Sequence, residues 1–426
     1  MLVHYTTFGC KVNYCDTESI ADLMTRAGFE RTDSLENADI EIVNSCTVTE
    51  NAHRRVRAAL RQAKRANPEM ITLLCGCYSQ AYPEDAASID CADIVTGNTV
   101  RADIPALVKR YIEEHEKVTS FLPHAKGELY ELLPQGSLDD HTRAFLKIED
   151  GCDRYCRYCA IPYARGHIRS IPLKEIKLRA KELHERGFKE IVLTGINLAM
   201  AGSDLDYSVA DAAHILSDIG VERIRLSSLE PDLIPEEMMK DLSRVRGLCP
   251  HFHLSLQSGC DRTLLSMGRK YRAHEYKEIT DRLRYYFDDP TFTTDVIVGF
   301  PGESDEDFYE SLSFVENFGF LKVHVFPYSM RPGTAAAKMS GHLPKSVKTG
   351  RAEIMGEACL RSRENVMNSF IGKRVTMLTE QLKNGWWYGY TERYVPVKIK
   401  AVPGIYQNMT VNGVCIENRG GTVTIE

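Results

Sequence analysis

The stretch Gly151-Cys152-Asp153-Arg154-Tyr155-Cys156-Arg157-Tyr158-Cys159 carries three cysteines with the spacing Cys-x3-Cys-x2-Cys. It follows a β-rich segment at 144–148, so we expect it on a loop at the carboxyl end of a strand. Three thiolates can hold three corners of a cubane [4Fe–4S] cluster and leave one iron open to a substrate or cofactor. A structural zinc site would need a fourth ligand at a similarly short spacing, and only His167 is nearby. The spacing therefore predicts an iron–sulfur centre with one open iron.

Strand and helix patterns alternate on the carboxyl side of this stretch. Strands are expected at 144–148, 190–194, 223–227, 252–256, 293–298 and 322–326, with helical segments between them and helices near 345–369. Six βα units of this kind predict a partial (β/α)6, TIM-like barrel, which keeps its active site at the carboxyl ends of the strands. The three-cysteine motif follows the first of these strands, so it belongs at that mouth.

More cysteines follow strands in the first hundred residues. Strands are expected at 2–7, 39–43 and 70–74, and helices at 16–27 and 50–66. This alternation predicts a parallel α/β domain. Cys10, Cys46 and the pair Cys75 and Cys77 each come just after a strand, and parallel strands place their carboxyl ends along one edge of a sheet. We therefore expect cysteines that are distant in sequence to become neighbours in space.

The carboxyl-terminal stretch changes character and is rich in β-structure. Strands expected at 374–380, 386–391, 395–399, 410–416 and 421–425 alternate with glycine and asparagine turns, as in a small β-barrel. The stretch at 113–137 contains prolines and glycines and is interpreted as a linker. The predicted organisation is an α/β domain at 1–112, this linker, a central domain at 138–369 and a β-barrel at 370–426.

The composition is typical of a globular protein. The chain has 426 residues, a net charge of −6 and 13 cysteines, and its length favours more than one core. We find no secretory signal and no apolar run long enough to cross a membrane, so we expect a cytoplasmic protein with no membrane partner. Stable disulfides are disfavoured in that compartment, which makes metal binding or catalysis the better interpretation for cysteines in motifs.

The central motif resembles the cluster loop of radical S-adenosylmethionine (SAM) enzymes. In that family the open iron binds SAM, whose reductive cleavage yields a 5′-deoxyadenosyl radical. Thr194-Gly195 resembles the family's glycine turn, with one glycine in place of the usual two, and the stretch 295–303 resembles the segment along which adenine lies. The resemblance implies a set of SAM-contacting residues. They are Tyr158, Gly195, Ser228, Glu230, Gln257, Asp295, Ile297, Gly299 and Pro327.

Three further stretches, 7–13, 44–49 and 76–80, resemble the N-terminal domain of the methylthiotransferases. The resemblance covers nearly the whole chain, and the terminal barrel is similar to the RNA-binding TRAM domain. It implies that Cys10, Cys46 and Cys77 ligate a second [4Fe–4S] cluster that holds the sulfur to be transferred. Cys75 competes locally with Cys77, which we prefer for its Gly-Cys-x-x-Gln context.

On this resemblance two trios of cysteines are the catalytic and metal-binding residues. Cys152, Cys156 and Cys159 serve radical generation, and Cys10, Cys46 and Cys77 present the sulfur. The cysteines outside such contexts are expected to be structural. They are Cys15, Cys91, Cys249, Cys260, Cys359 and Cys415.

Several stretches resemble the branch that methylthiolates N6-threonylcarbamoyladenosine in tRNA, namely 9–13, 46–49, 159–166, 251–259 and 326–329. The resemblance implies transfer of a methylthio group to C2 of that nucleoside next to the anticodon. The implied partners are the tRNA anticodon stem-loop and a reducing electron donor such as a flavodoxin or ferredoxin. Alternatives are the branches that act on N6-isopentenyladenosine in tRNA or on a ribosomal-protein aspartate. A non-catalytic, RNA-binding iron–sulfur redox sensor is the alternative of another class, and it would have no use for SAM-binding segments.

Two local features favour an RNA partner despite the negative net charge. Between 51 and 68 the chain has no acid and six basic residues, Arg54, Arg55, Arg57, Arg61, Lys64 and Arg65, which could follow phosphates. The terminal barrel has seven lysines and arginines against four acids. Its aromatic residues Trp386, Trp387, Tyr388 and Tyr390 are candidates for stacking on unpaired bases, although half of them are expected in the barrel core.

Overall fold

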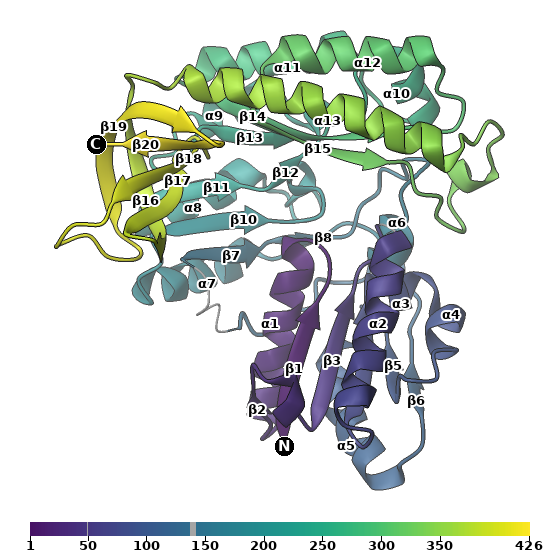
Figure 1. Cartoon of the computed structure of the whole chain (residues 1–426). Helices are drawn as coiled ribbons and strands as arrows, with labels where there is room; N and C mark the ends of the chain where they lie inside the picture. The colour runs from purple at the N-terminus through teal and green to yellow at the C-terminus, as the bar shows by residue number, and fades with distance from the viewer. Residues whose placement is uncertain (49, 137–141) are drawn as a thin grey trace.

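Parallel sheets and a closed barrel follow one another along the chain (Figure 1). The computed structural model describes residues 1–48, 50–136 and 142–426. Thr49 and the expected boundary at 137–138 lie outside the described residues. The N-terminal parallel sheet, the central parallel strands and the terminal barrel confirm the expected α/β fold, and the limits of the domains stay predictions.

The N-terminal sheet has parallel strands in the order β2-β1-β3-β4-β5-β6. The strands are β1 (Leu2–Thr7), β2 (Glu30–Arg31), β3 (Ile40–Ser45), β4 (Ile71–Gly76), β5 (Ile94–Thr96) and β6 (Val118–Ser120). The helices are α1 (Lys11–Arg26), α2 (Glu50–Ala66), α3 (Cys77–Ala81), α4 (Pro83–Ala87) and α5 (Ile104–Glu114). Ile42 packs in the core under α1 and α5, and its neighbour Val43 packs in the core under α2. This two-sided burial explains the continuous apolar runs, and β6 extends the sheet into the segment interpreted as a linker.

Two element boundaries differ from expectation and affect the cysteines. α1 begins at Lys11, directly after Cys10, and not at residue 16. The side-chain amide of Asn13 donates to the carbonyls of Phe8 (3.0 Å) and Ser45 (2.8 Å), which fixes this early first turn beside the ends of β1 and β3. β4 continues through Cys75, which is buried in the core under α1 and α5. The expectation that Cys75 stands past the strand end is therefore wrong.

The central strands all pair in parallel. They are β7 (Arg143–Lys147), β10 (Glu190–Thr194), β11 (Arg223–Leu226), β12 (Ser228–Leu229), β13 (His251–Leu254), β14 (Thr291–Val298) and β15 (Lys322–Pro327). The strand expected at 223–227 is interrupted at Ser227, because β11 pairs with β10 whereas β12 pairs with β13. The main helices are α7 (Leu173–Glu185), α8 (Val209–Ile219), α9 (Glu236–Leu242), α10 (Asp261–Met267), α11 (Ala273–Tyr286), α12 (Asp305–Phe318) and α13 (Lys345–Asn368).

The terminal barrel closes in the order β16-β17-β18-β20-β19. Its strands are β16 (Arg374–Lys383), β17 (Trp386–Thr391), β18 (Pro396–Lys400), β19 (Thr410–Arg419) and β20 (Thr422–Ile425). The long helix α13 runs along the central domain and leads into the barrel (Figure 1). Met377, Val397 and Val423 form part of the barrel core. Across the described part of the chain, no helix is both long enough and apolar enough to cross a membrane.

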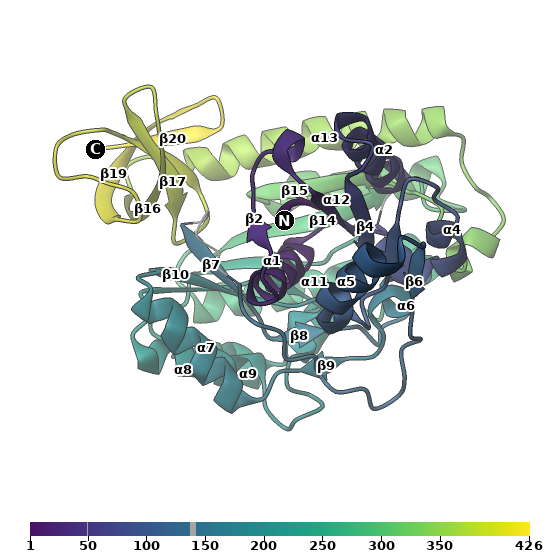
Figure 2. The same cartoon turned by 90° about the horizontal axis from the view of Figure 1, so that it is seen from below.

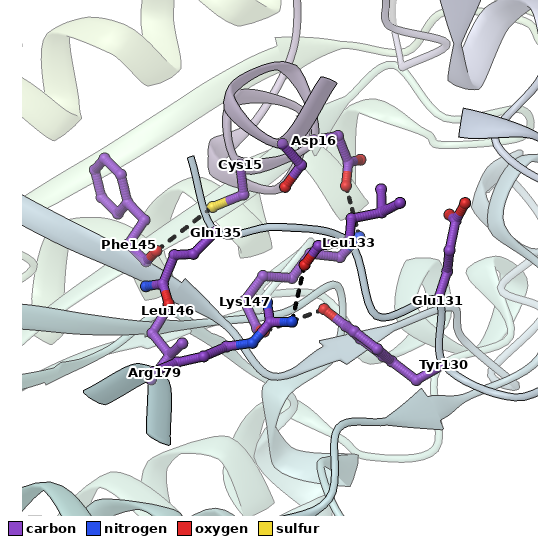
Figure 3. A pocket seen from close by; sticks show the side chains of 11 residues that line it. Cys15, Asp16, Tyr130, Glu131, Leu133, Gln135, Phe145, Leu146, Lys147 and Arg179 are labelled. Atoms are coloured by element: carbon purple, nitrogen blue, oxygen red, sulfur yellow. Dashed lines mark hydrogen bonds and ion pairs between the residues drawn. The ribbon is translucent and has the colours of Figure 1, made fainter. Parts of the chain in front are cut away.

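Helix α1 joins the N-terminal sheet to the central domain by packing against β7 (Figures 2 and 3). Asp16 of α1 forms an ion pair with Lys147 of β7 (2.7 Å). The Cys15 thiol lies 3.8 Å from the carbonyl of Phe145, and Figure 3 shows both side by side in this interface. The Tyr130 hydroxyl donates to the Lys147 carbonyl (3.1 Å). Cys15 is thus buried between the two domains, as a structural cysteine would be.

A buried carboxylate joins the central sheet to the terminal barrel. Glu190 of β10 contacts Arg225 and Arg223 of β11 at 2.8 Å each. Arg225 also donates to the carbonyls of Thr391 and Glu392, both at 3.3 Å, at the end of β17. Burial would raise the pKa of Glu190, but the surrounding arginines outweigh it and lower the pKa from 4.5 to about 2. Glu190 is therefore charged and holds the arginines that reach the barrel.

We expect Glu190→Gln to lower the free energy of unfolding at pH 7 by about 3–5 kcal/mol, because the arginines keep buried charges without their partner. A carboxyl with a depressed pKa adds stability that is complete above its unfolded pKa and is lost as pH falls toward the folded one. The difference between wild type and variant should therefore shrink below about pH 4.5, as urea unfolding at several pH values would measure. Glu380→Gln is the control, since burial raises the pKa of that carboxyl. An equal loss at every pH would contradict this account.

Candidate active site

A cavity of about 440 Å³ lies at the carboxyl ends of the central strands. Most of the residues expected at the site line it. They are Cys10, Cys152, Cys156, Tyr158, Cys159, Gly195, Ser228, Glu230, Gln257, Asp295, Ile297 and Pro327. Three expected residues, Cys46, Cys77 and Gly299, are not among its lining residues in the described part of the chain. The cavity thus brings a cysteine of the N-terminal domain to the central three-cysteine loop.

The central loop runs from β8 (Glu149–Asp150) to α6 (Ile161–Arg165). It begins at Gly151, whose φ is +90° and whose place a Cβ could not fill, because that atom would lie 2.0 Å from the His167 carbonyl oxygen. The Cys152 amide donates to the Gly166 carbonyl (3.1 Å), and the Cys159 amide donates to the Cys156 carbonyl (2.9 Å). These backbone contacts hold the three thiols on one short turn at the cavity wall.

Burial makes two thiols of this loop, those of Cys152 and Cys159, weak acids. It raises the pKa of Cys152 and of Cys159 to about 12, and the neighbouring cysteines of the loop add to the effect. Metal ligation requires the thiolate, so binding of a cluster here would release protons. A cationic group bound here would favour the thiolate forms of Cys152 and Cys159.

Arg269 is a buried site residue that the sequence patterns did not reveal. Its Nη1 donates to the Cys156 sulfur at 3.2 Å, and its guanidinium also contacts Glu230 and the Tyr271 hydroxyl. Arg269 lies just past α10, after Gly268, and belongs to no sequence motif that would identify it as a ligand or catalytic group. Only the fold brings it to a cysteine 113 positions away.

The segment after β10 offers unsatisfied polar atoms to the cavity. Asn197 is 5% exposed and lines the cavity, yet neither its side-chain nitrogen nor its oxygen has a hydrogen-bond partner within the described residues. A Cβ at Gly195 would come 2.5 Å from a carboxyl oxygen of Glu149, so any larger residue there would have to displace that buried carboxyl group. Buried amides normally have partners. A polar ligand such as SAM would supply the hydrogen-bond partners that the Asn197 side chain lacks among the described residues.

The second cysteine trio gathers where three N-terminal elements meet. Cys10 precedes α1, Cys46 follows β3, and Cys77 begins α3. The side-chain oxygen of Asn13 lies 3.7 Å from the Cys10 sulfur and 3.6 Å from the Cys77 sulfur. Burial, followed by the proximity of Cys77, raises the pKa of Cys46 to about 12. The three cysteines are thus neighbours, as the parallel-sheet argument predicts.

In the described part of the chain, neither cysteine trio is compact enough to hold a single metal ion. Within residues 1–48, 50–136 and 142–426, no three histidines, cysteines or carboxylates converge closely enough to hold one metal ion. In a cubane each thiolate binds its own iron, so the ligand sulfurs stand further apart than the ligands of a single ion. Cys10 and the three cysteines of the central loop line the same cavity.

Cys75 takes no part in this arrangement. Its thiol donates to the Val43 carbonyl (3.7 Å), and its side chain packs in the apolar core under α1 and α5. The cysteines expected to be structural are buried or half-buried, and those outside the interface are Cys91, Cys249, Cys260, Cys359 and Cys415. A small buried thiol of this kind acts as an apolar filler.

The features expected to favour RNA are only partly available for it. In α2, Arg57 pairs with Asp85 and Lys64 pairs with Asp93 (2.7 Å each). The others on this helix, Arg54, Arg55, Arg61 and Arg65, are exposed. In the barrel, Trp387 packs against the core. Tyr390 stacks on Tyr394, with ring centroids 4.6 Å apart. Trp386 and Tyr388 stay candidates for stacking on a base.

The N-terminal and central domains of this chain both match known protein families. Residues 146–315 match the Radical SAM superfamily, and residues 2–97 match "Uncharacterized protein family UPF0004". The chain is 36% identical to the Threonylcarbamoyladenosine tRNA methylthiotransferase MtaB of Bacillus subtilis, over 93% of this chain and 90% of that protein. It is 38% identical to the protein of the same name from Thermotoga maritima, over 92% and 90%. It is 36% identical to a tRNA-2-methylthio-N(6)-dimethylallyladenosine synthase of Thermoanaerobacter sp., over 88% and 82%.

Among solved structures, the radical SAM methyltransferase TsrM from Kitasatospora setae is similar at a TM-score of 0.57, over 79% of this chain and 77% of that one. At 14% identity this likeness shows a shared fold. The sequence relatives carry the stronger conclusion, since their identity extends over both the N-terminal sheet and the central strands. On this evidence the chain belongs to the radical SAM methylthiotransferase family and is an enzyme of that kind.

Proposed function

We propose that the enzyme adds a methylthio group to C2 of N6-threonylcarbamoyladenosine next to the anticodon of tRNA. The observation that carries this proposal is that Cys10, a member of the second trio, lines the same cavity as Cys152, Cys156 and Cys159 of the first. Sulfur insertion at an aromatic carbon needs both a radical source and a held sulfur atom. One cavity reached by two potential clusters provides for both.

Each part of the cavity has an assigned task in this proposal. Cys152, Cys156 and Cys159 would hold the first [4Fe–4S] cluster, and Cys10, Cys46 and Cys77 the second. With SAM bound, the clusters would supply the radical and the sulfur that form the new carbon–sulfur bond. The SAM-binding assignments concern residues of the cysteine loop and of the carboxyl ends of several central strands, and all of them except Gly299 line the cavity. They are Tyr158, Gly195, Ser228, Glu230, Gln257, Asp295, Ile297, Gly299 and Pro327.

Charge at the cavity favours the threonylcarbamoyl substrate over the isopentenyl one. The threonyl group carries a carboxylate, whereas an isopentenyl group is uncharged. Three arginines, Arg154, Arg269 and Arg331, line the cavity together with His253, against two carboxylates, Glu230 and Asp295. The relatives from Bacillus subtilis and Thermotoga maritima bear the threonylcarbamoyladenosine name. A flavodoxin or ferredoxin is the proposed electron donor.

The test compares nucleosides from tRNA of a strain with and without this gene by mass spectrometry. We expect 2-methylthio-N6-threonylcarbamoyladenosine to disappear while 2-methylthio-N6-isopentenyladenosine is unchanged, and the wild-type gene to restore it. Loss of the isopentenyl product instead would favour the alternative tRNA branch. Loss of the methylthio group from a ribosomal protein would favour the branch that acts on a ribosomal-protein aspartate.

Reconstituted protein separates these enzymes from a redox sensor. Two clusters predict roughly eight iron and eight sulfide per chain, and one cluster predicts roughly four. With dithionite and SAM an enzyme forms 5′-deoxyadenosine, whereas a sensor without turnover forms none. An iron content near four in wild-type protein would contradict the second cluster.

A further inference from the structure

Arg165 of α6 has no exposed surface and uses all of its donors. An arginine side chain presents five N–H groups in a planar fork. Here Nε donates to the Cys77 sulfur at 3.2 Å. Nη1 donates to both carboxyl oxygens of Asp150, at 2.9 and 3.1 Å. Nη2 donates to the side-chain oxygen of Asn13 (2.8 Å) and to Asp16 (2.9 Å). Five donors therefore meet five acceptors.

The acceptors of Arg165 belong to both domains. Cys77, Asn13 and Asp16 come from the N-terminal domain, whereas Asp150 directly precedes the central cysteine loop. Asp150 accepts from the Gly151 amide at 2.9 Å, so the same carboxylate orients the start of that loop. The guanidinium is thus bonded on one side to a second-trio sulfur and on the other to the residue that positions the first trio.

An analogous contact exists at the first trio. Arg269, 5% exposed, donates to the Cys156 sulfur at 3.2 Å, the same distance as from Arg165 to the Cys77 sulfur. Hydrogen bonds to ligand sulfurs are one of the means by which a protein sets the potential of a cluster. In each trio one sulfur therefore receives a hydrogen bond from a buried cation.

We propose that Arg165 is a positioning residue that sets the reduction potential of the second cluster and holds it against the first cysteine loop. The inference rests on the two-cluster function proposed above. In the reaction concerned, one electron from an external reductant takes a [4Fe–4S] cluster from the 2+ to the 1+ state, and no bond is formed or broken. The added negative charge spreads onto the ligand sulfurs and strengthens the N–H···S bond, so this bond raises the potential.

The experiment measures the midpoint potentials of both clusters in the reconstituted full chain by dithionite titration followed by electron paramagnetic resonance. Arg165→Lys keeps the positive charge, but a lysine ammonium group cannot replace the Nε bond to Cys77 and the four Nη bonds at the same time. We expect the reduction equilibrium of the second cluster to become about tenfold less favourable, as a charged hydrogen bond would cause. For a one-electron couple that is a shift of about 59 mV to lower potential.

Two matched variants serve as controls. Arg269→Lys removes the equivalent bond at the first trio. It should therefore lower the midpoint potential of the first cluster and leave that of the second unchanged. Arg169→Lys changes a buried arginine that contacts the His167 carbonyl (3.0 Å) and Glu128 (3.5 Å), so it should shift neither. Signals are assigned in a Cys152→Ala/Cys156→Ala/Cys159→Ala background, which retains the second cluster alone.

The outcomes separate the inference from the proposed function. A shift confined to the second cluster supports the role of Arg165, as does loss of that cluster alone with the first retained. Unchanged potentials in a protein that keeps about eight irons overturn it. Equal shifts, or loss of both clusters, also overturn it, because they would mean a general structural role. A wild-type protein with only one cluster would instead show that the proposed function itself is wrong.

Discussion

The Cys156→Ala variant should form no 5′-deoxyadenosine from SAM and should bind roughly four irons per chain where the wild type binds roughly eight. Its cubane would keep only the two thiolates of Cys152 and Cys159, and the Arg269 donor would lose its sulfur acceptor. Methylthio product should fall to background with it, because both reactions depend on this loop. The measurements are iron and sulfide analysis and chromatography of SAM cleavage products under anaerobic conditions.

Cys359→Ala is the matched control for that variant. Cys359 is buried in α13 at the edge of the central core and does not line the cavity in the described part of the chain. Loss of its sulfur should cost about 1 kcal/mol of stability, as is usual for a point mutation, and should leave the iron content and SAM cleavage intact. Retention of SAM cleavage by Cys156→Ala would mean that the loop does not hold the catalytic cluster.

Alanine at Cys77 and at Cys75 should have opposite effects although the two positions are two residues apart. Cys77→Ala should lose the second cluster and all methylthio product, yet still cleave SAM in the presence of dithionite. Its iron content should again be roughly four per chain. The reason is geometric, since the Cys77 sulfur shares Asn13 with Cys10 whereas Cys75 points into the apolar core.

Cys75→Ala should keep roughly eight irons and its activity. It should lose about 1–2 kcal/mol of unfolding free energy through the small cavity left under α1 and α5. Iron analysis, product assay and urea unfolding on both variants complete the comparison. The reverse pattern, with iron lost from Cys75→Ala and retained in Cys77→Ala, would transfer the ligand assignment to Cys75.

Local sequence patterns predict the order of helices and strands in this protein but not every contact between them. The alternation of strands and helices and the five strands of the terminal barrel are local properties, and the structure confirms them. The ends of individual helices and strands could not be predicted as well from the sequence. The first turn of α1 is fixed by Asn13 reaching Phe8 and Ser45, and a local pattern does not contain that contact. The sequence likewise predicts Trp387 and Tyr390 as possible RNA contacts. In the structure Trp387 packs against the barrel core and Tyr390 stacks on Tyr394.

The sequence by itself determined the radical SAM loop, because the ligands Cys152, Cys156 and Cys159 lie within eight positions and their spacing alone limits what they can bind. It also determined that Cys10 and Cys46 would meet at a sheet edge, since parallel strands end together. Only the tertiary structure showed that the Cys77 thiol lies beside Asn13 near Cys10 while the Cys75 side chain packs in the apolar core. The same holds for the arginines, because the bonds from Arg165 to Cys77 and from Arg269 to Cys156 join residues 88 and 113 positions apart. Such contacts depend on how whole domains pack.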